Sequence, residues 1–470
     1  MTPQPRIQLN QREWIKPKTP TPIDKSRLPL SDWDVVMFKS YTPMLLFYAN
    51  TEKMEDFMNT EVLIDSLQVV LDDFYPLAGR LVDIGQGRDE IECNDAGVLF
   101  QETSYPEELE SFKEDGYLPH QMDYHHMFPI HFYCSPQDPL LAIQVNRFLD
   151  GGVALGIMIL HKIADTYSAC LFLDAWAKQA RGLPYAKACF KRSLVSFPPN
   201  TVITEEAIHH YREEHKVVDP DHYRLRMDPN QQIYSRTTPD GPLPLKSIVL
   251  EFHSDGLQMC KKDAHTIEMM ESKTWMSTKE ALFGMLLRAI VRSRNIPRDE
   301  AVRMILGVNG RMKMKYTKNI DYYFGNWMIS RTITMDRRQV NSTHLAEAAM
   351  AFRRQLTSLR SSLFHGISKI YTMNEDMTVH YLTYQPNCDT QVTATDASSL
   401  PFWRLDFGFG RPDRTRGYIT SGGNGCLVLF GRNDGNKGVM YDVQLQMDAD
   451  SIKRFIDDPE VRKYSRRILY

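Results

Sequence analysis

The amino-acid sequence predicts a mixed fold, of the α/β or α+β class, in which two domains are joined by a crossover. Strand-like apolar runs and helical apolar repeats occur in both the early and the late part of the chain, which favours this class. A proline-rich stretch without sustained apolar periodicity separates the two parts, and 470 residues suffice for two or three domains. We expect an N-terminal domain over residues 1–190, a crossover over 191–245 and a C-terminal domain over 246–470.

Net charge, the length of the apolar runs and the cysteine pattern exclude several classes of protein. The formal net charge of −3 gives no electrostatic reason to expect a nucleic acid or an anionic membrane as partner. The longest apolar run, residues 151–160, is far too short to span a bilayer. Seven cysteines, an odd number without a C-x-x-C pair, argue against a disulfide framework and against a structural zinc site. We therefore expect a cytoplasmic protein with reduced thiols and with no metal, nucleic acid or membrane partner.

The first half begins with a helix and several strands. Apolar residues at helical spacing predict a helix over about 60–74, which Pro76 and Gly79 end. Strand-like runs follow at about 80–84, 89–92 and 97–101.

Two apolar runs later in the first half predict a β-hairpin. Residues 139–149 and 153–160 have the composition of buried strands, and a D-G-G turn joins them, where glycine supplies positive φ. A helix over 166–180 follows, because its apolar residues share one face, and Thr166 or Ser168 is the expected N-cap.

The crossover and the second half contain three patterns that predict helices or strands. We expect one short polar helix near 204–216 within the crossover, and a strand at 246–253 after it. A helix over 278–294 follows, where Ser277 and Glu280 fit a capping box.

The first candidate for chemistry is the pair His161 and Asp165, directly after the second strand of the hairpin. An imidazole accepts a proton from a hydroxyl, amine or thiol near neutral pH, and a strand end holds it rigidly. Asp165 would orient the loop or pair with a cation. The H-x-x-x-D spacing taken alone favours a buried structural histidine over a catalytic one.

The second candidate is the stretch RLDFGFGRP at 404–412. Two glycines, Gly408 and Gly410, lie between aromatic residues and indicate a tight backbone turn, and Asp406 at its head could pair with an arginine. A β-turn with packed aromatic side chains is the plain alternative. Arg311 follows a strand-like run and precedes an aromatic-Gly-Asn turn at 323–326.

Taken together and in order, these pieces resemble the BAHD family of acyl-CoA-dependent acyltransferases. The resemblance covers nearly the whole chain. Its motifs are YPLAGRL at 75–81, H-x-x-x-D at 161–165, STKEALFGMLLRAIVRSR at 277–294, YFGN at 323–326 and DFGFG at 406–410. It implies two similar-sized domains, each a mixed β-sheet flanked by helices, in the chloramphenicol acetyltransferase-like fold, with a channel between them.

The resemblance also implies an activity. His161 would be the general base that deprotonates a hydroxyl or amine of a small specialised metabolite, which then attacks the thioester of an acyl-CoA. The acyl group would be acetyl or of the aromatic, hydroxycinnamoyl type. No acyl-enzyme and no permanently bound cofactor are expected, with acyl-CoA as the co-substrate. We expect a monomer, because this two-domain fold closes its own active site.

The remaining site residues follow from the same resemblance. Asp165 would hold the shape of the site through Arg311, and Asp406 with Gly408 and Gly410 would support it structurally, the turn shaping the CoA side of the channel. Ser277 and Thr278, at a helix N-terminus suited to an anion, and the nearby Lys262 are candidates to contact the phosphates of CoA. Two departures from the family pattern are Phe409 in place of tryptophan and Thr166 in place of glycine.

Two alternatives remain open. Condensation domains of the wider superfamily use a carrier-protein thioester and usually show H-H-x-x-x-D-G, whereas Leu160 and Thr166 occupy the flanking positions here. A binding protein that keeps the fold without catalysis is the other alternative. Retention of His161, Asp165 and Asp406 together argues against it.

Overall fold

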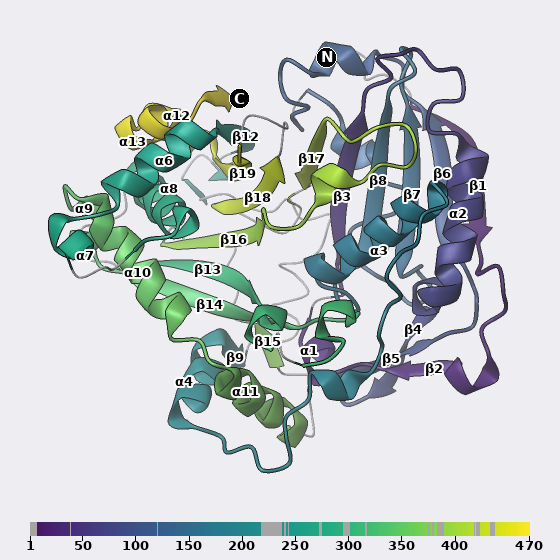
Figure 1. Ribbon diagram of the computed structural model, residues 1–470, viewed down its shortest axis with the longest axis horizontal. Helices are drawn as coiled ribbons and strands as arrows, with labels where there is room; N and C mark the ends of the chain where they lie inside the picture. Colours follow the sequence, from purple (N-terminus) through teal and green to yellow (C-terminus); the bar gives the residue numbers. More distant parts are fainter. Residues whose placement is uncertain are drawn as a thin grey trace.

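Two β-sheets with helices packed against them lie side by side in the computed structural model (Figure 1). The model describes residues 7–37, 39–119, 121–217, 237–238, 241–242, 244–271, 275–294, 301–314, 317–374, 377, 380–382, 390–417, 419, 424–432 and 438–470. Within these residues the mixed fold class predicted from the sequence is confirmed.

The first sheet has six strands in the order β1-β6-β7-β8-β3-β17. They span Gln8–Ile15 (β1), Val98–Ser104 (β6), Leu141–Arg147 (β7), Val153–Leu160 (β8), Tyr41–Tyr48 (β3) and Arg414–Gly417 (β17). Strands β7 and β8 pair antiparallel, so the predicted hairpin is confirmed. A smaller sheet beside it is built from Arg27–Pro29 (β2), Arg88–Glu92 (β5) and Arg80–Gly85 (β4).

The second sheet has seven strands in the order β14-β13-β16-β18-β19-β12-β20. They span Met328–Met335 (β14), Val302–Asn309 (β13), Gln391–Ala397 (β16), Cys426–Arg432 (β18), Met440–Asp448 (β19), Leu245–Phe252 (β12) and Arg467–Leu469 (β20). Two short pairs join His215–Val217 (β9) to His380–Leu382 (β15), and Thr237–Thr238 (β10) to Gly241–Pro242 (β11).

The helices divide between the two sheets (Figure 1). Those near the first sheet are Thr60–Asp73 (α2) and Thr166–Ala180 (α3), with the short Asp32–Val35 (α1) facing the second half. The others are Glu205–Glu214 (α4), Ser254–Asp263 (α6), Ile267–Glu271 (α7), Thr278–Arg294 (α8), Arg337–Asn341 (α9), Leu345–Thr357 (α10), Ser361–Met373 (α11), Ala449–Ile456 (α12) and Pro459–Tyr464 (α13). None of the described helices combines the length and the apolar character needed to cross a bilayer.

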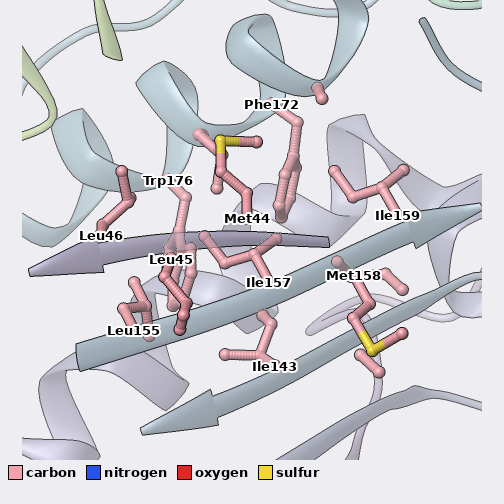
Figure 2. Packing of buried hydrophobic residues seen from close by; sticks show 14 of the residues in the cluster. Met44, Leu45, Leu46, Ile143, Leu155, Ile157, Met158, Ile159, Phe172 and Trp176 are labelled. Atoms are coloured by element: carbon pink, nitrogen blue, oxygen red, sulfur yellow. The ribbon is translucent and has the colours of Figure 1, made fainter. Parts of the chain in front are cut away.

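Strand β8 is buried along its whole length, which explains its unbroken apolar sequence. Figure 2 shows Phe172 and Trp176 reaching from α3 toward the face of the sheet that carries Ile157 and Ile159, whereas Met158 points to the opposite face. This two-sided packing fixes the strand, and therefore the residue that follows it, within a rigid core.

The helices predicted over 60–74, 166–180 and 278–294 are confirmed as α2, α3 and α8. The predicted N-cap of α3 is wrong, because neither Thr166 nor Ser168 fills that position. Asp165 does, with an extended backbone and a side chain that accepts a hydrogen bond from the Ser168 N–H. Within the expected crossover over 191–245, residues 218–236 lie outside the described residues.

Segments exchange between the two halves. Strand β17, from the late part of the chain, pairs antiparallel with β3 at the edge of the first sheet (Figure 1). In the opposite direction, Trp33 of α1 packs edge-on against Trp327, with ring centroids 4.8 Å apart. Strand β17 thus belongs by sequence to the expected C-terminal domain, over 246–470, but by pairing to the sheet of the N-terminal half.

Candidate active site

His161 lies directly after β8, beside a cavity of about 120 Å³. The cavity is lined by His161, Asp165, Thr166, Tyr167, Gly307, Asn309, Met328, Thr395, Asp396, Ser399 and Leu400. The loop after β8 and the start of α3, from the first half, therefore meet β13, β14 and β16 of the second sheet, so that both halves of the chain contribute to one pocket.

The backbone of His161 is held on both sides. Its N–H donates to the carbonyl of Ser40 at 2.8 Å, and its carbonyl accepts from Nδ2 of Asn326 at 2.8 Å. The ring atom Nδ1 is buried and has no hydrogen-bond partner among the residues that the structure describes. Nε2 is therefore the candidate ring nitrogen for contact with a molecule in the cavity that His161 lines.

Asp165 is fully engaged by donors. Its Oδ2 lies 2.7 Å from Nη1 of Arg311 and accepts from the N–H of Trp327 at 3.0 Å, while Oδ1 caps α3. Burial alone would raise the pKa of Asp165, but the charge and hydrogen bond of Arg311 and two backbone N–H donors hold that pKa below its ordinary value. The carboxylate is thus ionised and oriented by its neighbours.

Arg311 is buried and fills a site with several acceptors. Besides Asp165, it donates from Nη2 to Oγ of Ser168 at 3.0 Å and to the carbonyls of Tyr323 and Gly325 at 3.1 Å each. The guanidinium also lies 4.5 Å from the ring centre of Tyr167. The structure therefore brings together Asp165 and the arginine predicted as its partner, from opposite halves of the chain.

The turn at 406–410 lies elsewhere. Oδ1 of Asp406 accepts from the N–H groups of Gly408 and Gly410 at 2.8 and 3.0 Å, and its Oδ2 lies 3.5 Å from Nη1 of Arg181. Both glycines have positive φ, of 104° and 99°, which other residues rarely adopt. The turn packs against the first half of the chain, where the Phe407 ring lies 4.8 Å from that of Trp176 in α3 and 6.2 Å from that of Tyr48 in β3. None of its residues is among those that line the cavity.

Asp406→Ala should lower stability more than it lowers the rate per folded molecule. The substitution removes the acceptor of two backbone N–H groups in a partly exposed turn, at a cost of roughly 1–2 kcal/mol. Urea unfolding measures this loss, and Asp406→Asn, which keeps one acceptor oxygen, should lose less. A fall in kcat of more than about 100-fold at unchanged stability would instead place the turn in the chemistry.

The candidates for contact with CoA lie where the end of α6 meets the start of α8, and none of them lines the cavity. Ser277 and Glu280 form the predicted capping box at the start of α8, with bonds of 3.1 and 2.7 Å. Lys262 is in the last turn of α6, and His265 just beyond it accepts from the N–H of Met276 at 3.0 Å, which places the two helix ends together. Thr278, the first residue of α8, is partly exposed there.

Lys279 connects this helix end to the cavity. Its Nζ lies 2.7 Å from Oδ2 of Asp396, a residue of β16 that lines the cavity. The two residues are 117 positions apart, so no local pattern indicates this pair. The sequence places Asn326 in the YFGN stretch but does not indicate a role for its side chain. For Asp34, the local pattern S-x-x-D predicts a capping box and nothing more.

Comparison with known proteins identifies the family. Residues 6–461 match the family model described as "Transferase family". Among curated relatives, the chain is 25% identical over 455 residues to a shikimate O-hydroxycinnamoyltransferase of Nicotiana tabacum, covering 94% of this chain and 97% of that protein. It is 26% identical over 429 residues to anthranilate N-benzoyltransferase protein 3 of Dianthus caryophyllus, covering 86% and 89%.

Solved structures show the same fold. TRI101 of F. graminearum, solved with coenzyme A and deoxynivalenol, matches with a TM-score of 0.76 at 17% identity, over 94% of this chain and 100% of that chain. Vinorine synthase matches with a TM-score of 0.69 at 20% identity, over 98% of both chains. The fold is thus that of the CoA-dependent acyltransferases. The chain belongs to the transferase family whose model it matches, that of the BAHD acyl-CoA-dependent acyltransferases.

Proposed function

We propose that His161 is the general base of a direct acyl transfer from acyl-CoA to a hydroxyl or amine. The observation that carries this proposal is the position of His161 at the wall of a cavity to which both halves of the chain contribute. An imidazole at the cavity wall with Nδ1 buried suits proton transfer between Nε2 and a bound acceptor.

The reaction would need only the acceptor and the thioester. Nε2 of His161 takes the proton of the acceptor hydroxyl or amine as the oxygen or nitrogen attacks the thioester carbonyl carbon. The tetrahedral intermediate then collapses, the carbon–sulfur bond breaks, and the proton on His161 passes to the departing sulfur to give free CoA. No acyl-enzyme forms, and the imidazole is neutral again at the end.

Asp165 and Arg311 have a positioning role in this proposal. Three donors already engage the Asp165 carboxylate, which therefore does not have to act as an acid or a base itself. The pair links the start of α3 to the segment after β13 and so keeps the cavity in shape. Asp406, Gly408 and Gly410 support the fold around the first sheet.

The donor would reach the cavity from the side of α8. Ser277, Thr278 and Lys262 are the proposed contacts to the CoA phosphates, supported by their shared position where the ends of α6 and α8 meet. Relatives named for hydroxycinnamoyl and benzoyl transfer favour an aromatic acyl group, with acetyl as the simpler alternative. The acceptor would be a small specialised metabolite.

The test is a substrate panel. Purified protein is mixed with acetyl-, benzoyl- and hydroxycinnamoyl-CoA and with alcohols and amines that include shikimate and anthranilate. Release of free thiol and the masses of new products are followed, with His161→Ala in parallel. Acceptor-dependent thiol release by the unchanged protein alone supports the proposal. No release from any CoA ester, with CoA failing to raise the melting temperature, would favour a carrier-protein donor or a binding protein.

The proposal includes a cytoplasmic monomer with domains over 1–190 and 246–470 and a crossover between them. Its support is that one chain supplies residues of the cavity from both of its halves. The six cysteines within the described residues are unpaired, as expected for a reducing compartment. Light scattering coupled to size exclusion measures the mass, and a stable dimer would contradict the monomer without affecting the chemistry.

A further inference from the structure

The carbonyl of His161 is the end of a buried chain of hydrogen bonds that begins at Asp34. Nδ2 of Asn326 donates to this carbonyl at 2.8 Å and to Oδ1 of Asp34 at 2.9 Å. The backbone N–H of Asn326 donates to the same Oδ1 at 2.7 Å. Asp34 and Asn326 are both fully buried, so that no water competes for these groups.

Asp34 is itself rigidly held. Its Oδ2 accepts from the N–H and Oγ of Ser31, at 2.9 and 2.6 Å, in the capping box of α1. Nη1 of Arg192 lies 3.8 Å from the same oxygen. A carboxylate with both oxygens engaged in this way has one available orientation. Its hydrogen bonds in turn fix the orientation of the Asn326 side chain.

Lys162, the residue after His161, is tied to the same part of the chain. Its buried Nζ donates to the carbonyl of Val35 at 2.7 Å and lies 3.3 Å from Oδ2 of Asp89. We name residues 31–37 the clamp segment. It is thus linked to His161 through Asn326 and to Lys162 directly.

The turn at 323–327 connects this clamp segment to Asp165. The N–H of Asn326 donates to Asp34, and the next N–H, of Trp327, donates to Asp165. Two adjacent backbone donors therefore bind two buried carboxylates, one in α1 and one at the N-cap of α3. The H-x-x-x-D stretch is held by this turn at both of its ends.

We propose that Asp34 and Asn326 are positioning residues for His161, and this inference rests on the proposed role of His161 as the base. Neither residue lines the cavity, so neither touches a substrate. Asparagine suits the position because its amide supplies two N–H donors, one for Asp34 and one for the His161 carbonyl. Misplacement of a reacting group by about 1 Å is enough to cost on the order of 100-fold in rate.

The test compares two buried asparagines. Asn326→Ala removes the bond to His161, while the backbone N–H of residue 326 still reaches Asp34. Asn146→Ala is the matched control, because Asn146 is equally buried and donates from Nδ2 to the carbonyls of Met127 and Ala154 at 3.2 and 3.0 Å, away from the cavity. For each variant, kcat, the KM of both substrates and the melting temperature are measured well below unfolding.

We expect Asn326→Ala to lower kcat by about 100-fold with both KM values changed only a few-fold. Asn146→Ala should lose comparable stability and keep kcat within a few-fold, since loss of stability alone does not move a reacting group. Asp34→Asn keeps an acceptor for Asn326 and should retain more activity than Asp34→Ala. The inference is overturned if Asn326→Ala keeps kcat within a factor of about three, or if Asn146→Ala loses as much.

His161→Ala in the same assay separates the two ideas. If it is inactive while Asn326→Ala is fully active, positioning through Asp34 fails and the base assignment stands. If His161→Ala is itself fully active, the base assignment fails, whatever the asparagine variants show.

Discussion

We expect His161→Ala to lower kcat for the acceptor-dependent release of CoA by roughly 10²- to 10⁴-fold, the contribution typical of a general base. The reason is that the imidazole is the proposed proton acceptor at the wall of the cavity, where it follows a strand fixed by a two-sided core. Free thiol is followed with saturating acyl-CoA and acceptor, and the melting temperature is measured on the same sample.

The fold should tolerate this change, because the hydrogen bonds of His161 to Ser40 and Asn326 use only its backbone. His161→Gln is a useful control, since glutamine keeps a polar side chain of similar size but accepts no proton near neutral pH. A rate for either variant within about ten-fold of the unchanged enzyme would show that another group takes the proton.

Arg311→Ala produces the largest expected loss of stability, of about 3–5 kcal/mol, because it leaves the buried carboxylate of Asp165 without its charged partner. It also removes the donors to Ser168 and to the carbonyls of the turn that holds Asn326. Urea unfolding at neutral pH measures the stability. Activity per folded molecule should fall as well, since the end of the turn next to His161 loses its support.

The stability deficit of Arg311→Ala should depend on pH, because it comes from the ionised carboxylate of Asp165. The pKa of Asp165 lies below its ordinary value, so its pairing stabilises the fold above about pH 4, and this stability is lost as the pH falls through the lowered pKa. In Arg311→Ala the charge that lowers that pKa is gone, and burial, which raises it, is opposed only by the N–H groups of Ser168 and Trp327, so the pKa rises. The deficit of the variant should therefore be largest at neutral pH and shrink in acid, where the carboxyl is protonated in both proteins.

Arg311→Lys is the matched control. Lysine keeps the charge but presents a compact ammonium instead of a planar fork, and so cannot reach Asp165, Ser168 and the two carbonyls together. It should recover part of the stability. If Arg311→Ala matched the unchanged protein in stability at every pH, the ion pair would have no energetic role.

Local patterns in the sequence predicted the elements around the site well. The bounds of α3 follow from its apolar face, and β8 from a run of apolar residues too short for a helix, because both depend on neighbours within a few positions. The N-cap of α3 was missed, although Asp165 precedes the helix directly. Asp165 therefore has two roles, as the aspartate of H-x-x-x-D and as the N-cap of α3.

Contacts between distant residues could not be derived in this way. The pairing of Asp165 with Arg311, 146 positions away, was predicted only through the family resemblance. The S-x-x-D pattern at Asp34 does predict a capping box, but nothing local indicates that its other oxygen binds Asn326, 292 positions later. The same holds for Lys279 and Asp396, which join α8 to the cavity.

The exchange of β17 has a mechanical consequence. Because this strand leaves the second half of the chain and is hydrogen-bonded to β3 along Arg414–Gly417, the two sheets cannot swing apart as a hinge without breaking a ladder of backbone bonds. Each half also inserts aromatic side chains into the other, as Trp33 and Phe407 do. Substrates should therefore reach the cavity without separation of the two sheets, and release of products should depend on motion of side chains and loops and not on domain opening.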